Sequence, residues 1–229
     1  MVIIIFIAFI VTCITVDAVI QYSRRKRAKT PDKSEVSSRV FNEASLSAPL
    51  GLYFDKTHTW AYIEKNGLVK IGIDDFILHI TGALNRVKMK NPGEIIQKGE
   101  PVLSIIRNGK QLTINSPVSG TIKSQNHRLT EDCSLINSSP FYEGWVYMIE
   151  PSNWLRETQF MFMGDKYKEW LKNEFSRLKD FLASIRLIDN KELLPIMLQD
   201  GGELKDDLLA DCEPELWEEF QIKFINTYR

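Results

Sequence analysis

The sequence has few cysteines and almost no net charge. Its three cysteines (Cys13, Cys133 and Cys212) are far apart, and no CxxC pair occurs, which excludes a disulfide framework and a cysteine-based zinc site. Its 29 Lys+Arg nearly cancel 30 Asp+Glu, which excludes a strongly basic nucleic-acid binder. With 12 Gly and 9 Pro, the chain is neither collagen-like nor wholly disordered.

Motifs of catalysis and metal binding are also missing. The three histidines (His58, His79 and His127) are isolated, without the HxH or HxxxH spacing of a metal site. No GxSxG, GxGxxG or Gly-rich phosphate loop occurs. We therefore expect a protein that is not an enzyme by itself.

The N-terminus contains a long apolar run. Residues 2–16 carry no charge, and the run extends to about 19 residues, enough to span a bilayer core of roughly 30 Å as a helix. A basic cluster, 24–29, follows at once, and basic flanks stay in the cytoplasm. The sequence predicts a transmembrane anchor over 1–29, then a Ser- and Pro-rich linker over 30–51.

The middle of the chain has the pattern of short β-strands. Asn-Gly pairs at 66–67 and 108–109 stand between alternating apolar residues, which is the strongest short-range hairpin signal. Brief helices are expected near 74–84 and 130–135, and a last strand at 144–149. This spacing predicts a mainly β domain, a small sandwich or barrel.

Five pieces of this segment occur in a characteristic order. They are FDKTHTW at 54–60, VKIGIDDF at 69–76, NPGEIIQKGE at 91–100, SPVSG at 116–120, and a closing stretch with Leu135, Asn137, Pro140 and Glu143-Gly144-Trp145. Together they resemble the H-protein of the glycine cleavage system over residues 52–155. The resemblance implies the lipoyl-domain fold of two flattened β-sheets.

The resemblance also implies a site. In the H-protein family, one lysine at a hairpin tip carries lipoamide, seven residues before the Ser of Ser-Pro-Val-Ser-Gly. Here that place holds Gly109, and Lys110 follows one position later. Ile106 or Arg107 stands where the family has an acidic residue. If Asn108-Gly109 forms the turn, Lys110 begins the returning strand, and a one-residue shift reverses the face of a side chain.

Lys110 therefore has competing interpretations. In the favoured interpretation, the domain keeps the fold but has a degenerate lipoylation site. The hairpin tip Arg107-Asn108-Gly109 then carries no lipoyl group, and no cofactor is bound. In the alternative, Lys110 carries lipoate despite its altered context. The plainest interpretation is a solvated lysine at the end of a strand.

Residues 156–229 form a helical tail that the H-protein family lacks. Apolar residues every three or four positions predict a helix over 165–184, followed by a shorter helix over 189–198. A last helix begins at Pro214, in acidic surroundings, and carries Trp217, Phe220 and Phe224. These aromatic residues either pack within the chain or dock a partner protein.

We therefore predict a single-pass protein of the inner or plasma membrane, with its N-terminus outside and its domain in the cytoplasm. Its predicted function is that of a non-catalytic adaptor or subunit of a complex at the cytoplasmic face, with redox chemistry suggested only by analogy of fold. The expected partners are the membrane and an unidentified cytoplasmic protein complex, and no nucleic acid. The alternative is a lipoyl-carrying H-protein that shuttles an aminomethyl group on lipoyl-Lys110 among the glycine cleavage enzymes.

Overall fold

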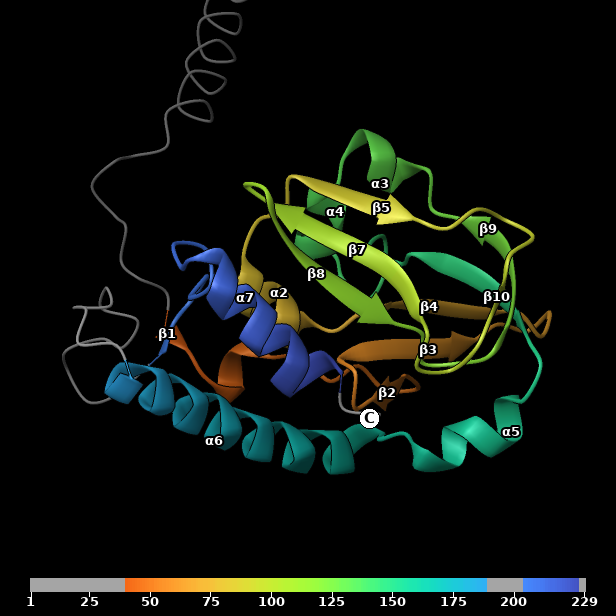
Figure 1. Cartoon of the computed structure of the whole chain (residues 1–229). Helices are drawn as coiled ribbons and strands as arrows, with labels where there is room; N and C mark the ends of the chain where they lie inside the picture. Colours follow the sequence, from red (N-terminus) through yellow and green to blue (C-terminus); the bar gives the residue numbers. More distant parts are fainter. Residues whose placement is uncertain (1–39, 189–203, 227–229) are drawn as a thin grey trace, which may run out of the picture. The chain divides into compact units, whose positions relative to one another are not determined.

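The computed structural model describes residues 40–188 and 204–226 (Figure 1). Within them, antiparallel strands form a six-stranded sheet of order β2-β3-β4-β10-β9-β6, a three-stranded sheet β5-β7-β8 and a small sheet β1-β11. The strands are β1 Val40–Phe41, β2 Tyr53–Asp55, β3 Thr59–Ile63, β4 Val69–Ile73, β5 Arg86–Met89, β6 Ile95–Ile96, β7 Pro101–Arg107, β8 Lys110–Asn115, β9 Gly120–Gln125, β10 Tyr147–Pro151 and β11 Leu204–Lys205.

Helices follow and interrupt these strands. The α-helices are α2 Asp75–Thr81, α3 Arg128–Glu131, α4 Ser134–Ser138, α5 Trp154–Glu157, α6 Gly164–Ile188 and α7 Pro214–Phe220. Short 3-10 turns lie at η1 Glu43–Ser45 and η2 Thr158–Phe160, and a π-helical turn, η3 Gln221–Ile225, continues α7. The predicted helix over 189–198 lies outside the described residues.

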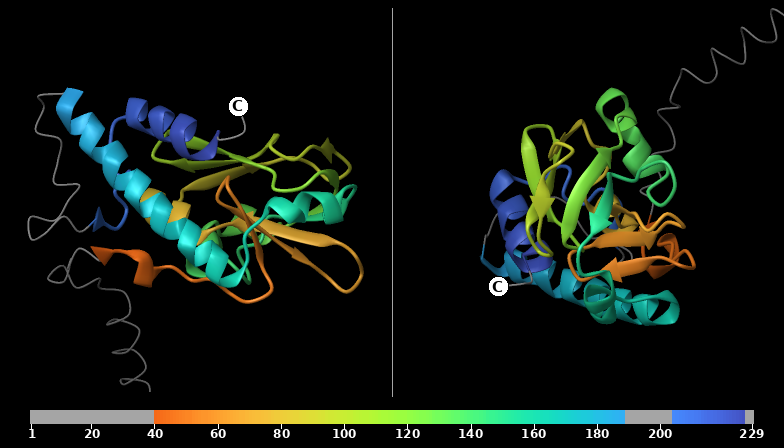
Figure 2. Two further views of the ribbon diagram at one scale, coloured as in Figure 1. Left: turned by 90° about the horizontal axis from the view of Figure 1, so that it is seen from below. Right: turned by 90° about the vertical axis from the view of Figure 1, so that its right-hand side faces the viewer.

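The main core lies between the six-stranded and three-stranded sheets, which face each other in Figure 2. Ile71 on β4, Val102 on β7, Ile114 on β8 and Tyr147 on β10 line one small cavity between them. All four side chains are at most 4% exposed. The prediction of a mainly β, lipoyl-type sandwich is therefore confirmed.

The two Asn-Gly pairs form different turns. Asn108 and Gly109 both have positive φ, 49° and 82°, so β7 and β8 are joined by the predicted two-residue turn. At the other hairpin only Gly67 has positive φ, at 82°. There the side chain of Asn66 accepts a hydrogen bond from the Leu68 amide at 3.0 Å, which closes a longer loop between β3 and β4.

The last part of the predicted linker belongs to the folded unit. β1 pairs with β11, which brings residues 40–41 beside residues 204–205. The Phe41 ring is 2% exposed and lies 4.7 Å from the ring of Phe175 on α6. The predicted linker is thus wrong over 40–51, because its one aromatic side chain finds a buried partner. Residues 30–39 lie outside the described part of the chain.

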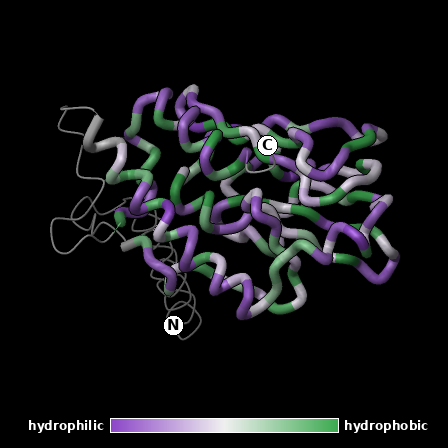
Figure 3. Tube along the Cα trace, turned by 60° about the horizontal axis from the view of Figure 1, so that its bottom comes forward, coloured by the Kyte–Doolittle hydropathy of each residue, from purple (hydrophilic) through white to green (hydrophobic). Residues whose placement is uncertain are grey.

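The tail packs on the β domain. Helix α6 buries its apolar stripe, and α7 with η3 lies between α6 and β8 (Figure 1). Hydrophilic and hydrophobic residues alternate along the α6 trace in Figure 3, as the 3.6-residue period requires. The Phe181 ring on α6 lies 6.2 Å and 5.6 Å from the rings of Phe220 and Phe224. The aromatic residues of the last helix thus pack within the chain.

The described residues contain no membrane span. Over 40–188 and 204–226, none of the helices combines the length and the apolar character that crossing a bilayer requires. This finding contradicts the predicted single-pass membrane localisation. The segment predicted as the anchor, 1–29, lies outside the described residues.

Candidate functional site

The β7–β8 hairpin presents Lys110 beside its turn. Arg107 pairs with Lys110 across the hairpin, so Lys110 is the first residue of the returning strand. Asn108 and Gly109 are exposed at the tip, and a Cβ built on Gly109 meets nothing within 4 Å. The side chain of Lys110 is half-buried. The tip is thus open to an approaching protein, while the lysine beside it is partly covered.

Arg107 folds back from the tip toward α2. Its guanidinium donates to the Thr81 carbonyl at 2.5 Å and lies 3.7 Å from the Asp207 carboxylate. A Cβ on Gly82 would meet this guanidinium at 1.8 Å, and Gly82 has φ of 69°. Only glycine leaves room for the arginine here. Arg107 thus joins the hairpin to α2 and to the tail.

The tail holds the Lys110 amine. Nζ donates to the carbonyl oxygens of Ala210 at 2.6 Å and Cys212 at 2.9 Å. The Trp217 ring lies 5.6 Å from Nζ, within reach of a cation–π interaction. Trp217 in turn donates from Nε1 to the Leu209 carbonyl at 2.8 Å, which fixes the segment that carries both acceptors. Lys110 is therefore not the solvated strand-end lysine of the plainest interpretation.

The same tail covers the edge of strand β8. In the three-stranded sheet β8 is an edge strand, so its outer amides and carbonyls lack a neighbouring strand. The Gln221 side chain accepts from the Thr113 amide at 2.6 Å and donates to the Thr113 carbonyl at 2.8 Å. Asn115 donates to the Ile225 carbonyl at 3.4 Å. Three points along β8 are thus bound by residues 210–225.

The aromatic residues predicted to dock a partner are buried. Trp217, Phe220 and Phe224 are 1%, 0% and 1% exposed. The rings of Phe220 and Phe224 stack at 4.5 Å, and the Arg177 guanidinium covers Phe224 at 4.8 Å. This burial corrects the expectation of an exposed docking face. The apolar face of α7 and η3 is covered by α6 and β8.

A second segment fastens the tail to α2. The Asp207 amide donates to the His79 carbonyl at 2.7 Å, and the Leu209 amide donates to the Ile80 carbonyl at 3.0 Å. The His79 ring and the Asp206 carboxylate lie 2.8 Å apart. Burial lowers the pKa of His79, but the carboxylates of Asp206, Asp75 and Asp207 together outweigh burial and raise it. Asp206 and Asp207 of the tail therefore each have a basic partner, His79 and Arg107.

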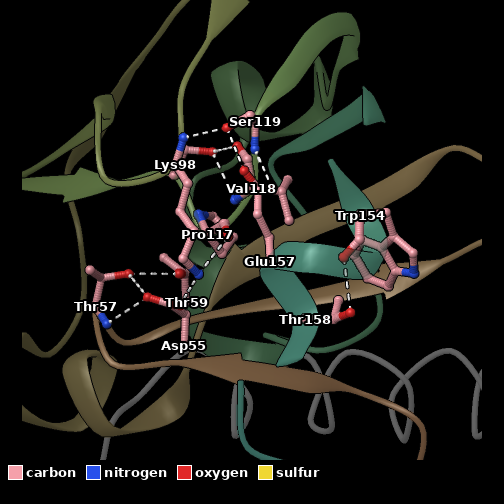
Figure 4. A network of polar contacts seen from close by, with 11 residues as sticks. Asp55, Thr57, Thr59, Lys98, Pro117, Val118, Ser119, Trp154, Glu157 and Thr158 are labelled. Carbon is pink, nitrogen blue, oxygen red and sulfur yellow. Dashed lines mark hydrogen bonds and ion pairs between the residues drawn. The ribbon is translucent and has the colours of Figure 1, made fainter. Parts of the chain in front are cut away.

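The Ser-Pro-Val-Ser-Gly motif forms a polar network (Figure 4). Lys98 forms an ion pair with the buried Asp55 and donates to the Pro117 carbonyl at 3.0 Å. Ser119 donates from its amide and its hydroxyl to the two oxygens of Glu157, at 2.8 Å and 2.6 Å. The network joins β2, the loop before β9 and α5. Because the polar groups of this network bind one another, we interpret the network as structural.

A buried cluster of charges lies under α6. His58 is 0% exposed, and its Nδ1 lies 3.0 Å from Asp74. Its Nε2 lies 3.7 Å from Glu174 of α6, an ion-pair distance too long for a hydrogen bond. Burial lowers the pKa of His58, but the carboxylates of Asp74 and Glu174 outweigh burial and raise it to about 9. The cluster therefore ties α6 to the β domain.

Other reactive groups are sparse in the described part of the chain. There, no group of three or more His, Cys, Asp or Glu side chains is placed to hold a metal ion. Burial raises the pKa of the Cys212 thiol to about 11, with Lys110 acting in the opposite direction. Its thiol is therefore protonated near neutral pH and is a poor nucleophile.

Sequence reasoning found Lys110 but missed what holds it. The acceptors are main-chain carbonyls of Ala210 and Cys212, and a carbonyl leaves no signal in a sequence. Gln221 is likewise an ordinary polar residue among many. The nearest available signal was Pro214, which predicts the start of the helix that follows these carbonyls.

These observations define the class of protein. Two facing antiparallel sheets with a lysine beside a hairpin turn are the architecture of a lipoyl-type domain. A family model described as "Glycine cleavage H-protein" matches residues 52–174, more than half of the chain. The chain therefore belongs to the glycine cleavage H-protein family. The match extends into the first turns of α6, beyond the predicted boundary at residue 155.

Relatives of the same name cover about half of the chain. A probable glycine cleavage system H protein of Pyrococcus abyssi is 33% identical over 54% of this chain and 91% of its own length. The H protein of Stenotrophomonas maltophilia is 33% identical over 55% and 95%. H protein 2 of Aquifex aeolicus is 28% identical over 55% and 81%. A solved H protein of Mycobacterium marinum aligns with TM-score 0.43 and 25% identity over 45% and 86%.

Proposed function

We propose that this protein is a lipoyl carrier of the glycine cleavage type, with Lys110 as the attachment residue. The observation that carries the proposal is the position of Lys110, on the hairpin of an H-protein-family domain and next to an exposed turn. The protein would then be a mobile-arm substrate of partner enzymes rather than a catalyst. This role is the alternative that the sequence left open beside the adaptor.

The geometry around Lys110 fits a lipoyl group under one condition. The exposed Asn108-Gly109 turn gives a ligase a protruding element to bind. On the amine itself, the carbonyls of Ala210 and Cys212 occupy the space that an acyl group needs. The residues of the hairpin therefore fit the group once the tail segment that carries these two carbonyls has moved.

Attachment requires an ordinary acyl transfer at Nζ. The deprotonated amine attacks the carbonyl carbon of an activated lipoyl donor, such as an acyl adenylate. The amide bond forms, the acyl–phosphate bond breaks, AMP leaves, and the ammonium has lost two protons in total. A lipoyl group on Lys110 would supply a dithiolane for carrying an aminomethyl group and electrons, and the β7–β8 hairpin would hold it beside the exposed turn.

A second candidate function rests on the contacts of the same amine. Two short charge-assisted hydrogen bonds and a nearby aromatic ring are what a structural cation has. In that case the domain is a non-catalytic adaptor, and Lys110 holds the tail in place without any cofactor. The observation favours this role only for the unmodified lysine.

Reconstitution with the glycine cleavage enzymes tests the proposal. The full chain, Lys110→Arg and Lys65→Arg are each made in a lipoate-replete host and mixed with the partner enzymes and glycine. Lys65 is the matched control, because it is exposed beside the other Asn-Gly turn. We expect glycine-dependent release of carbon dioxide from the wild type and Lys65→Arg, and none from Lys110→Arg. Activity in none of the three proteins would favour the adaptor, and equal activity of all three would contradict Lys110 as the attachment residue.

A further inference from the structure

We propose that residues 204–226, the tail segment, are a latch that holds the Lys110 amine in the unmodified protein and opens for acylation. The inference rests on the proposed function, because it concerns the regulation of the same lysine. Acylation and closure of the latch are then mutually exclusive states of the tail.

The chemistry of the amine makes the two states exclusive. As an ammonium, Lys110 has three hydrogens and a charge, and it donates to both Ala210 and Cys212. As an amide, the same nitrogen has one hydrogen and no charge, so it cannot hold both carbonyls. The attached acyl group also needs the space in which these carbonyls lie. Closure of the latch therefore distinguishes the unmodified lysine from the acylated one.

The latch is attached beyond the lysine as well. Gln221 binds both main-chain groups of Thr113, and Ile225 accepts from Asn115 two positions further along β8. These contacts lie on one strand with Lys110, so the segment binds β8 as a unit. Releasing the middle contact at Thr113 is expected to loosen the end that covers the lysine.

The opposite side of the segment has its own anchor. Asp207 contacts Arg107 and the His79 carbonyl, and this contact lies on α2 and the end of β7 rather than on β8. The contacts of Asp207 with Arg107 and His79 do not involve the Lys110 amine. Residues 204–209 are thus attached to β1 and α2 by contacts that do not involve β8, and the part of the latch proposed to open is 210–226.

The reactivity of Lys110 toward a small acylating reagent tests the latch without any lipoate enzyme. Full-length protein made without lipoate is treated with N-hydroxysuccinimidyl acetate, and the acetylation rates of Lys110 and the exposed Lys65 are compared by peptide mass spectrometry. Because two hydrogen bonds to the charged amine must break before it can react, we expect the closed latch to slow acetylation of Lys110 by about tenfold or more relative to Lys65.

A pair of matched variants tests the role of the tail. Gln221→Glu removes the donor to the Thr113 carbonyl and places a negative charge beside it. Gln111→Glu makes the same change at an exposed position of β8 next to Lys110, where the side chain contacts Ser104. We expect Gln221→Glu to raise the Lys110/Lys65 ratio by about threefold or more, because a neutral hydrogen bond is worth a factor of that size. Gln111→Glu should leave the ratio within about twofold.

Hydrogen exchange gives a second readout. The Thr113 amide donates to Gln221, so its exchange reports closure of the latch. We expect faster exchange in Lys110→Gln, which is neutral like an acylated lysine, than in Lys110→Arg, which keeps the charge. The latch is overturned if wild-type Lys110 reacts as fast as Lys65, if both glutamate variants have the same ratio, or if both Lys110 variants exchange alike.

The outcome is separable from that of the proposed function. If Lys110 reacts slowly but the protein never carries lipoate, the latch proposal is supported and the carrier proposal is contradicted. If Lys110 reacts as fast as Lys65 and the protein does carry lipoate, the carrier proposal is supported and the latch proposal is contradicted.

Discussion

Replacing His58 should reduce the dependence of stability on pH between about pH 6.5 and 9. The ring is buried between Asp74 and Glu174, which raise its pKa from 6.5 to about 9 against the effect of burial. At about 1.36 kcal/mol per pKa unit, this rise corresponds to roughly 3 kcal/mol of stability. His58 therefore contributes more to the link between α6 and the β domain than any exposed ion pair.

The sign follows from which state keeps the proton. Up to about pH 9 the folded protein holds the charge on His58, whereas the unfolded chain loses it above 6.5. The contribution is therefore complete below pH 6.5 and is lost as the pH rises to about 9. Glu174 fits this picture, since burial raises its pKa but His58 and Arg177 outweigh burial and lower it.

The assay is urea unfolding of the full chain at a series of pH values across this range. His58→Asn is the variant, because His58 has φ of 59° and asparagine tolerates positive φ. His127→Asn is the matched control at an exposed position. We expect the wild type and the control to lose stability in parallel toward pH 9, and His58→Asn to lose about 3 kcal/mol less over the same interval.

Other titrating groups, such as the buried Asp75, are common to all three proteins and cancel in the comparison. If His58→Asn fails to fold, Glu174→Gln removes one of the two carboxylates and should flatten the same slope in part. Parallel curves for His58→Asn and the wild type would refute the reasoning, because the charge on His58 would then contribute nothing.

Two substitutions in the β domain test its packing and its polar network. Gly72→Ala places a Cβ 2.5 Å from the Trp60 ring, so we expect a loss of about 1–3 kcal/mol in urea unfolding; no loss would mean that the ring can move aside. Asp55→Asn breaks the buried pair with Lys98 and should cost about 3–5 kcal/mol, whereas Lys123→Ala, which breaks an exposed pair, should cost less than about 1 kcal/mol. Similar losses for Asp55→Asn and Lys123→Ala would contradict the structural role of the network.

Local signals in the sequence predicted the hairpins and helices well. The Asn108-Gly109 turn, the helix near 74–84 (α2) and the helix beginning at Pro214 all occur as expected. The Asn66-Gly67 turn is a different type, because the Asn66 side chain offers the backbone an alternative hydrogen bond. Short-range sequence patterns therefore located both turns, but the type of each turn depends on which hydrogen bonds its side chains form with the backbone.

Contacts between distant segments could not be predicted in the same way. The pairing of β1 with β11 joins residues more than 160 positions apart and uses main-chain groups, which every sequence has. The cover on Lys110 is also made by main-chain carbonyls. An amphipathic last helix indicates that a partner surface exists, but periodicity does not say whether that surface is another protein or the chain itself.

The modification state of Lys110 is the most direct test of the carrier. The full chain is made in a lipoate-replete host, digested, and mapped by tandem mass spectrometry, with Lys110→Arg as the control. We expect the mass of one lipoyl group on the peptide that contains Lys110, and an unmodified Lys110→Arg protein. An unmodified Lys110, or a lipoyl group on another lysine, would contradict the account.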